Sequence, residues 1–120
     1  MSNKVQALLT EYSQDPDGDH MCDYPEVEQW KVYYRKIVAA LRSDFKKANF
    51  SDIKFTRGHK ALSGFVTYSN GSIVYISISA DFDPHSVLIR TATSYKDYSG
   101  GSNNYAKSNS IVDSVISLVS

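Results

Sequence analysis

The sequence has few of the features that mark secreted, membrane-spanning or highly charged proteins. Its 120 residues include one cysteine, Cys22, so no disulfide can form within the chain, and a location in a reducing cytoplasm is expected. No apolar run approaches the length of about 18 residues that suggests a transmembrane helix. The N-terminal segment lacks the apolar stretch of a signal peptide. We therefore expect no membrane contact.

Motifs of catalysis and metal binding are also scarce. The chain contains no paired cysteine or histidine spacing typical of zinc sites and no phosphate-binding P-loop motif. Its length supports a single core and excludes Rossmann and TIM-barrel enzymes. The sequence therefore predicts one domain, residues 1–120, and favours a non-enzymatic protein.

The net charge is zero, but the charges are segregated along the chain. The 13 basic and 13 acidic side chains cancel, which argues against a polybasic nucleic-acid coat. Residues 11–28 nevertheless carry seven acids and no base, whereas residues 31–60 carry nine bases and two acids. An acidic surface and a basic surface are expected.

Two helices are predicted in the first part of the chain. Apolar residues recur at three- and four-residue spacing in residues 2–13, and again from Pro25, which suits a first helical turn, to about Ala48. On the helical wheel four bases of the second helix cluster within about 60°. They are Lys31, Arg35, Arg42 and Lys46. They form either a solvated helix face or a basic ridge for phosphates or an acidic partner.

The hydrophobic period then changes to two, which predicts strands at 52–57, 62–69, 72–79 and 86–92. Asn70-Gly71 is typical of a two-residue type I′ turn, which would place Phe65 opposite Ile76. One sheet face would then carry Phe65, Val74, Ile76 and Ile78, and the other Val66, Tyr68, Ile73 and Tyr75. The second face is more aromatic than a solvated sheet requires, so a helix, a partner or a second copy of the chain is expected to cover it.

The last quarter of the chain is predicted to be a polar loop followed by a helix. The loop covers residues 93–106, and apolar pairs at 111/112, 115/116 and 118/119 have helical spacing. The predicted fold is α+β: a short and a long N-terminal helix, a four-stranded and mainly antiparallel sheet, and a C-terminal helix.

The acidic loop between the first two helices partly matches the EF-hand calcium pattern. Oxygen ligands occupy the required positions at Asp15, Asp17, Asp19, Asp23 and Glu26. His20, however, stands where the pattern needs glycine. Either an ordinary solvated connection or a partner-binding acidic loop that also includes Glu28 is therefore favoured over a calcium site, and no cofactor is predicted.

The polar segment from Arg90 to Tyr105 is a second candidate site. Arg90 and Lys96 could pair with phosphate, and Gly100-Gly101 could bring backbone amides close to an anion. The other polar members are Asp97, Tyr98, Asn103 and Asn104. The segment is either a ligand loop or a long ordered loop whose polar side chains satisfy turns.

Residues 55–105 resemble small α+β proteins carried by bacterial phages and integrative elements. The resemblance is carried by Gly64-Phe65, the Asn70-Gly71 turn, the strand at 74–79, residues 88–92 and the segment KDYSGGSNNY at 96–105. The resemblance implies no particular activity. It implies a mobile-element setting in the cytoplasm of a bacterial host, in which small accessory proteins, anti-CRISPR proteins among them, bind and disable host machinery.

Three functions fit the sequence. The first is a non-enzymatic accessory protein that binds and inhibits a host defence or nucleic-acid-processing complex, with the two charged blocks, Tyr68 and Tyr75 as contact residues. The second is a small-ligand or nucleotide-binding protein, or a hydrolase, that uses loop 90–105. The third is direct nucleic-acid binding through the basic ridge of the second helix.

Overall fold

The computed structural model describes residues 4–13, 24–58, 61–79, 86–95 and 102–119. The helices are α1 (Lys4–Ser13), α2 (Tyr24–Lys47) and α3 (Ile111–Val119). The strands are β1 (Ser51–Gly58), β2 (Ala61–Thr67), β3 (Ile73–Ser79), β4 (Ser86–Ala92) and β5 (Asn104–Lys107). The α+β class and the three predicted helices are confirmed, and the described chain has one strand more than predicted.

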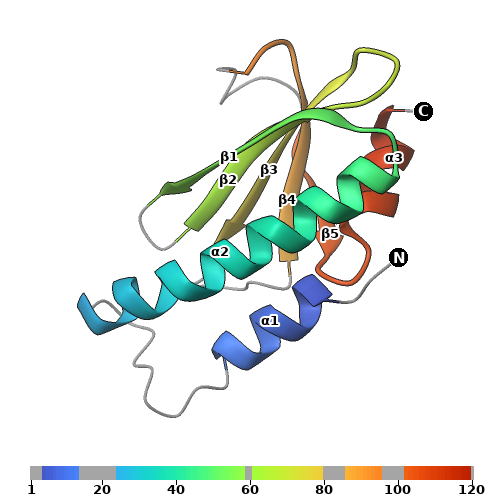
Figure 1. Cartoon of the computed structure of the whole chain (residues 1–120). Helices are drawn as coiled ribbons and strands as arrows, with labels where there is room; N and C mark the ends of the chain where they lie inside the picture. Colours follow the sequence, from blue (N-terminus) through green and yellow to red (C-terminus); the bar gives the residue numbers. More distant parts are fainter. Residues whose placement is uncertain (1–3, 14–23, 59–60, 80–85, 96–101, 120) are drawn as a thin grey trace.

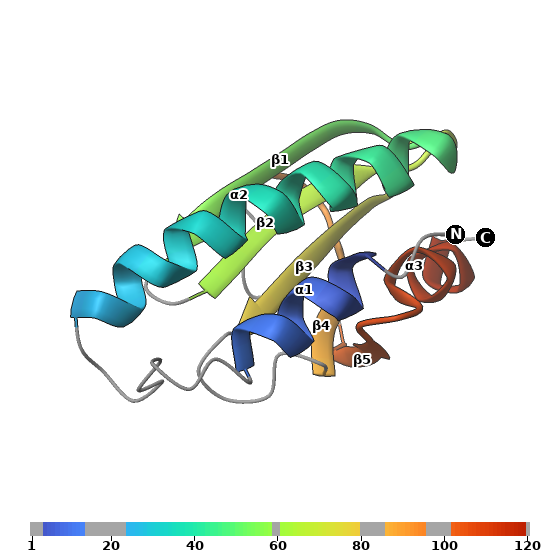
Figure 2. The same ribbon diagram turned by 60° about the horizontal axis from the view of Figure 1, so that its bottom comes forward.

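The strands form one antiparallel meander. Their order in the sheet, β1-β2-β3-β4-β5, is their order in the chain, so each strand pairs with the one before it (Figure 1). Helix α2 packs on β1, and α1 lies alongside α2 on the same side of the sheet (Figure 2). Helix α3 contacts β4 and β5. No helix in the described part of the chain has both the length and the apolar content that a bilayer span requires.

One hydrophobic core joins the three helices to one face of the sheet. The apolar stripe of α2 supplies Trp30, Ile37, Leu41 and Phe45, each at most 1% exposed. The other helices contribute Val5, Leu8, Leu9 and Tyr12 from α1 and Ile111, Val112 and Val115 from α3. The sheet contributes Phe55, Leu62, Val66, Val74, Ile76, Ile78, Val87, Ile89 and Ala106. The three-four periodicity of α2 is therefore explained by burial of a single stripe.

Helix α2 ends in a Schellman motif. Asn49 has a positive φ of 68°, the Phe50 amide donates to the Phe45 carbonyl at 3.0 Å, and the Asn49 amide donates to the Lys46 carbonyl at 3.2 Å. The Phe45 and Phe50 rings meet edge to face with centroids 4.9 Å apart. The motif turns the chain sharply from α2 into β1.

The β2–β3 hairpin differs from the prediction by one residue in register. Val66 pairs with Val74 and Phe65 with Tyr75, because Tyr68 and Ser72 close a three-residue loop in which Gly71 has φ of 90°. A three-residue loop with a left-handed glycine is the next commonest hairpin after the two-residue turn. A shift of one residue moves side chains to the opposite face. Phe65 therefore lies on the face away from the helices, whereas Val66 belongs to the helix-side core. The predicted faces were wrong for the residues of β2 and correct for those of β3.

The fifth strand, β5, lies inside the segment predicted to be a polar loop. Asn104, Tyr105, Ala106 and Lys107 pair with β4, and Ala106 alone is buried. Four residues with one buried alanine show no two-residue hydrophobic alternation. Pairing with β4, rather than local sequence, makes this segment a strand.

Candidate functional site

An aromatic and cationic cluster covers part of the sheet face opposite the helices. Phe65 lies at its centre and is 4% exposed, although it is not part of the helix-side core. Tyr75 and Tyr95 flank it, with ring centroids 5.1 Å and 5.9 Å from that of Phe65. The Tyr95 hydroxyl hydrogen-bonds to Thr67 of β2, so Tyr95, which follows β4, is held against the sheet.

Two cations complete this cluster by stacking on its rings. The Arg90 guanidinium carbon lies 4.7 Å from the centroid of Tyr75, and the Lys54 ammonium lies 5.2 Å from the centroid of Tyr95. Both distances are within the range of attractive cation–π contacts. We call Lys54, Phe65, Tyr75, Arg90 and Tyr95 the aromatic face. Lys54 is exposed and Tyr75 half-buried, so the aromatic face offers both charge and ring surface to a partner.

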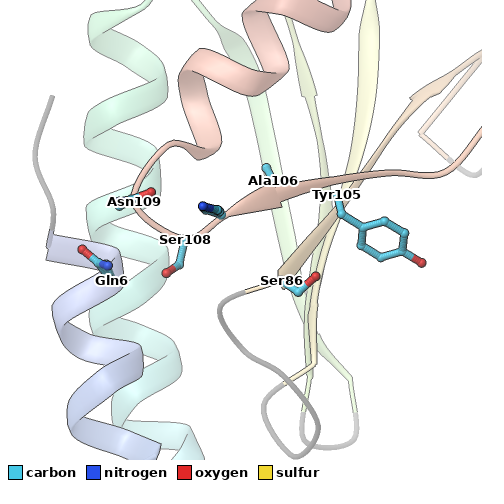
Figure 3. A pocket seen from close by; sticks show the side chains of 7 residues that line it. Gln6, Ser86, Tyr105, Ala106, Ser108 and Asn109 are labelled. Atoms are coloured by element: carbon cyan, nitrogen blue, oxygen red, sulfur yellow. The ribbon is translucent and has the colours of Figure 1, made fainter.

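Tyr105 extends the same side of the sheet as far as β5. It pairs with Leu88 in the register, is 67% exposed, and projects from β5 away from α1 (Figure 3). Beside it lies an open hollow of about 480 Å³, lined by Gln6, Ser86, Tyr105, Ala106, Lys107, Ser108 and Asn109. No acid, histidine or cysteine is among these lining residues. The described lining therefore offers polar and backbone contacts and one cation, Lys107.

Every charged residue exposed on α2 is basic over the described side chains of the helix, residues 30–47. Its exposed residues are Val32, Arg35, Lys36, Ala39, Arg42, Ser43, Lys46 and Lys47. The one acid in this range, Asp44, is 7% exposed and lies in a small hollow with the first turn of α3. Of the predicted ridge, Arg35, Arg42 and Lys46 are exposed, whereas Lys31 is half-buried.

The two predicted tyrosine contacts lie in different places. Tyr75 belongs to the aromatic face, whereas Tyr68 packs its ring on Phe50, with centroids 4.8 Å apart, beside the helix-side core. Tyr95 and Lys54 are contributors that sequence reasoning missed. Lys54 directly precedes the core residue Phe55 in β1, and this alternation predicts that Lys54 lies on the outer face. No local pattern around Tyr95 predicts that its ring packs on the sheet.

Most of the predicted acidic site lies outside the described residues. Asp15, Asp17, Asp19 and Asp23 precede α2, and Glu26 and Glu28 lie on its first turns, where only the backbone is described. The calcium alternative therefore stays a prediction. Among the residues that the structure does describe, no cluster of three or more potential metal ligands occurs.

The predicted ligand loop is described only at its two ends. Arg90 is 6% exposed and stacks on Tyr75, while Asn103 and Asn104 are exposed, with the Asn104 amide donating to the Ser102 carbonyl at 3.0 Å. The other members, Lys96, Asp97, Tyr98, Gly100 and Gly101, lie outside the described residues. The described part places Arg90 in β4 on the ring of Tyr75, and places Asn104 at the start of β5, with Asn103 directly before it.

Comparison of this chain with protein-family models, curated proteins and solved structures finds no match.

Proposed function

We propose that this protein is a non-enzymatic accessory factor that binds and inhibits a host defence or nucleic-acid-processing complex. The observation that supports the proposal is the sheet face opposite the helices, where Tyr75, Arg90, Tyr95 and Tyr105 lie on the side that no described helix covers. Tyrosine and arginine are enriched in protein interfaces and among the residues that dominate binding energy.

The arrangement of this face suits binding more than it suits stability. A sheet face that only meets water needs no rings, because polar side chains serve there. Here the rings of Tyr75 and Tyr95 pack on Phe65 and bury it, so the three rings support one another. Rigid aromatic side chains provide contact area at low entropic cost. Lys54 and Tyr105, both exposed, lie on the two edge strands of this face and would enclose a partner seated on it.

Inhibition can be tested in host strains that each carry one defence system, with a phage which that system targets. Expression of the wild-type protein should restore plating against at least one system. The double variant Lys54→Glu with Tyr105→Ser should lose this effect, since truncation of an interface hot spot weakens binding on the order of 30-fold. Both residues are exposed, so the variant should keep its fold, which circular dichroism checks.

Val32→Ser is the matched control. Val32 is the other large apolar residue that is markedly exposed in the described chain, at 52%, and it lies on α2. Its substitution should leave plating as in the wild type. If the double variant restores phage plating as well as the wild type does, the sheet face is not the contact surface. A wild-type protein that restores plating against none of the systems would contradict inhibition itself.

A further inference from the structure

We infer that the exposed side of α2 binds the phosphate backbone of double-stranded DNA. The surface consists of Arg35, Arg42 and Lys46, flanked by Lys36 and Lys47, and we call it the basic ridge. It lies on α2, whereas the aromatic face lies on the side of the sheet away from the helices. The inference is therefore independent of the proposed function.

Charge is the first observation that supports the ridge. Five cations and no acid are exposed over the described side chains of α2, because Asp44 is buried towards α3. The chain has as many acids as bases, yet none of its acids is exposed on α2 over residues 30–47, where the side chains are described. Arg42 and Lys46 are also four residues apart, a spacing at which like charges destabilise a helix. The pattern therefore works against helix stability and favours an anionic partner.

Helix electrostatics explain only part of this pattern. Lys46 and Lys47 occupy the last turn of α2, where the helix dipole favours cations. That effect falls off within one turn, so it does not account for Arg35 or Arg42. Lys36 lies near the ring of Tyr33, with its ammonium 5.7 Å from the centroid, and so has a local contact. Neither the helix dipole nor a ring contact accounts for the exposed positions of Arg35 and Arg42. An external anion would account for them.

The shape and composition of the ridge favour duplex DNA over an acidic protein or a single strand. Protein interfaces have an apolar or aromatic centre, whereas only Val32, Ala39 and Ser43 are exposed among these cations. Single-strand sites add aromatic rings on which bases stack, and no exposed ring lies on the described part of α2. Arg35 and Lys46 are separated by about 17 Å along a straight helix, a length that spans several phosphates of one DNA strand.

The direct test is fluorescence anisotropy of purified protein with a labelled duplex of random sequence at several salt concentrations. If three cations each neutralise a phosphate, the slope of log affinity against log salt should be about −2.7. Affinity should then fall about 40-fold between about 50 and about 200 mM salt. The variant Arg35→Gln/Arg42→Gln/Lys46→Gln should lose most of the binding and most of the slope, while Arg35→Lys/Arg42→Lys should retain both.

A charge-matched triple variant separates the ridge from net charge. Lys4→Gln/Lys54→Gln/Lys107→Gln removes three exposed lysines from α1, β1 and β5, and it should bind DNA like the wild type. Equal loss in the two triple variants would overturn the inference. A flat salt response, or tighter binding to a single strand or to double-stranded RNA than to duplex DNA, would overturn it as well. The variant Lys54→Glu with Tyr105→Ser should keep wild-type DNA affinity, so the outcomes for the two proposals are distinguishable.

Discussion

Gly64 of β2 lies very close to the backbone of the neighbouring strand, β1. A Cβ atom built on Gly64 would lie 2.6 Å from Cδ1 and 2.8 Å from Cα of Phe55, and it would also collide with the Lys54 carbonyl oxygen. Two of these three neighbours are backbone atoms, which cannot rotate away. The residue pairs with Phe55 in the register, so the missing side chain makes room for the Phe55 ring.

Gly64→Ala should therefore destabilise the protein by about 1–3 kcal/mol, the usual cost of overpacking a core. Urea unfolding followed by circular dichroism measures this as a lower midpoint. Ser63→Ala is the control, because Ser63 is half-exposed on the opposite face and should change stability by less than about 0.5 kcal/mol. A Gly64→Ala protein as stable as the wild type would show that β1 and β2 are further apart than described.

Among the elements, the end of α2 sets the direction in which the sheet begins. Asn49 holds a left-handed conformation that glycine adopts without strain and that alanine adopts at a cost of about 1–2 kcal/mol. Asn49→Gly should keep or slightly raise the unfolding temperature, and Asn49→Ala should lower it, as thermal unfolding of the three proteins would show. An Asn49→Ala protein at least as stable as Asn49→Gly would contradict the capping geometry.

The elements also show what could be predicted from the sequence. Helix α2 was predictable because its buried residues recur at three- and four-residue spacing, and β3 and β4 because they are short runs rich in valine and isoleucine. Strand β5 was not, since only Ala106 is buried there. The hairpin register was missed because Asn-Gly occurs both in two-residue turns and in three-residue loops. Here Gly71 closes a three-residue loop, while the Asn70 side chain accepts from the Ser72 amide at 2.9 Å.

That one-residue register difference decided how well the candidate site could be predicted. Phe65 was predicted to share a face with Val74, Ile76 and Ile78, but in the structure it lies at the centre of the aromatic face, beside Tyr75. Tyr95 joins them across 28 residues of sequence through Thr67, and no local pattern signals a contact of that range. The basic ridge, in contrast, depends on the periodicity of one helix, so the exposed positions of Arg35, Arg42 and Lys46 followed from the wheel.

At the scale of the whole molecule, the fold separates two surfaces of different chemistry. Helix α2 exposes cations but no fully exposed ring over its described side chains, whereas the far side of the sheet presents rings with cations stacked on them. A factor that acts on a nucleic-acid-processing complex would use the first surface on the nucleic acid and the second on the protein. Zero net charge hides this arrangement, because the cations of both surfaces are balanced by acids elsewhere in the chain, seven of them in residues 11–28.

Photo-crosslinking tests the central claim, inhibition by binding through the sheet face, most directly. A benzophenone amino acid placed at Tyr105, exposed beside the aromatic face, should form a covalent adduct with a subunit of the inhibited complex in host cells. The same group at Ala7, exposed on α1, should form none. An adduct at position 7 but not at position 105, or no adduct at either position in cells where the protein inhibits, would contradict the account.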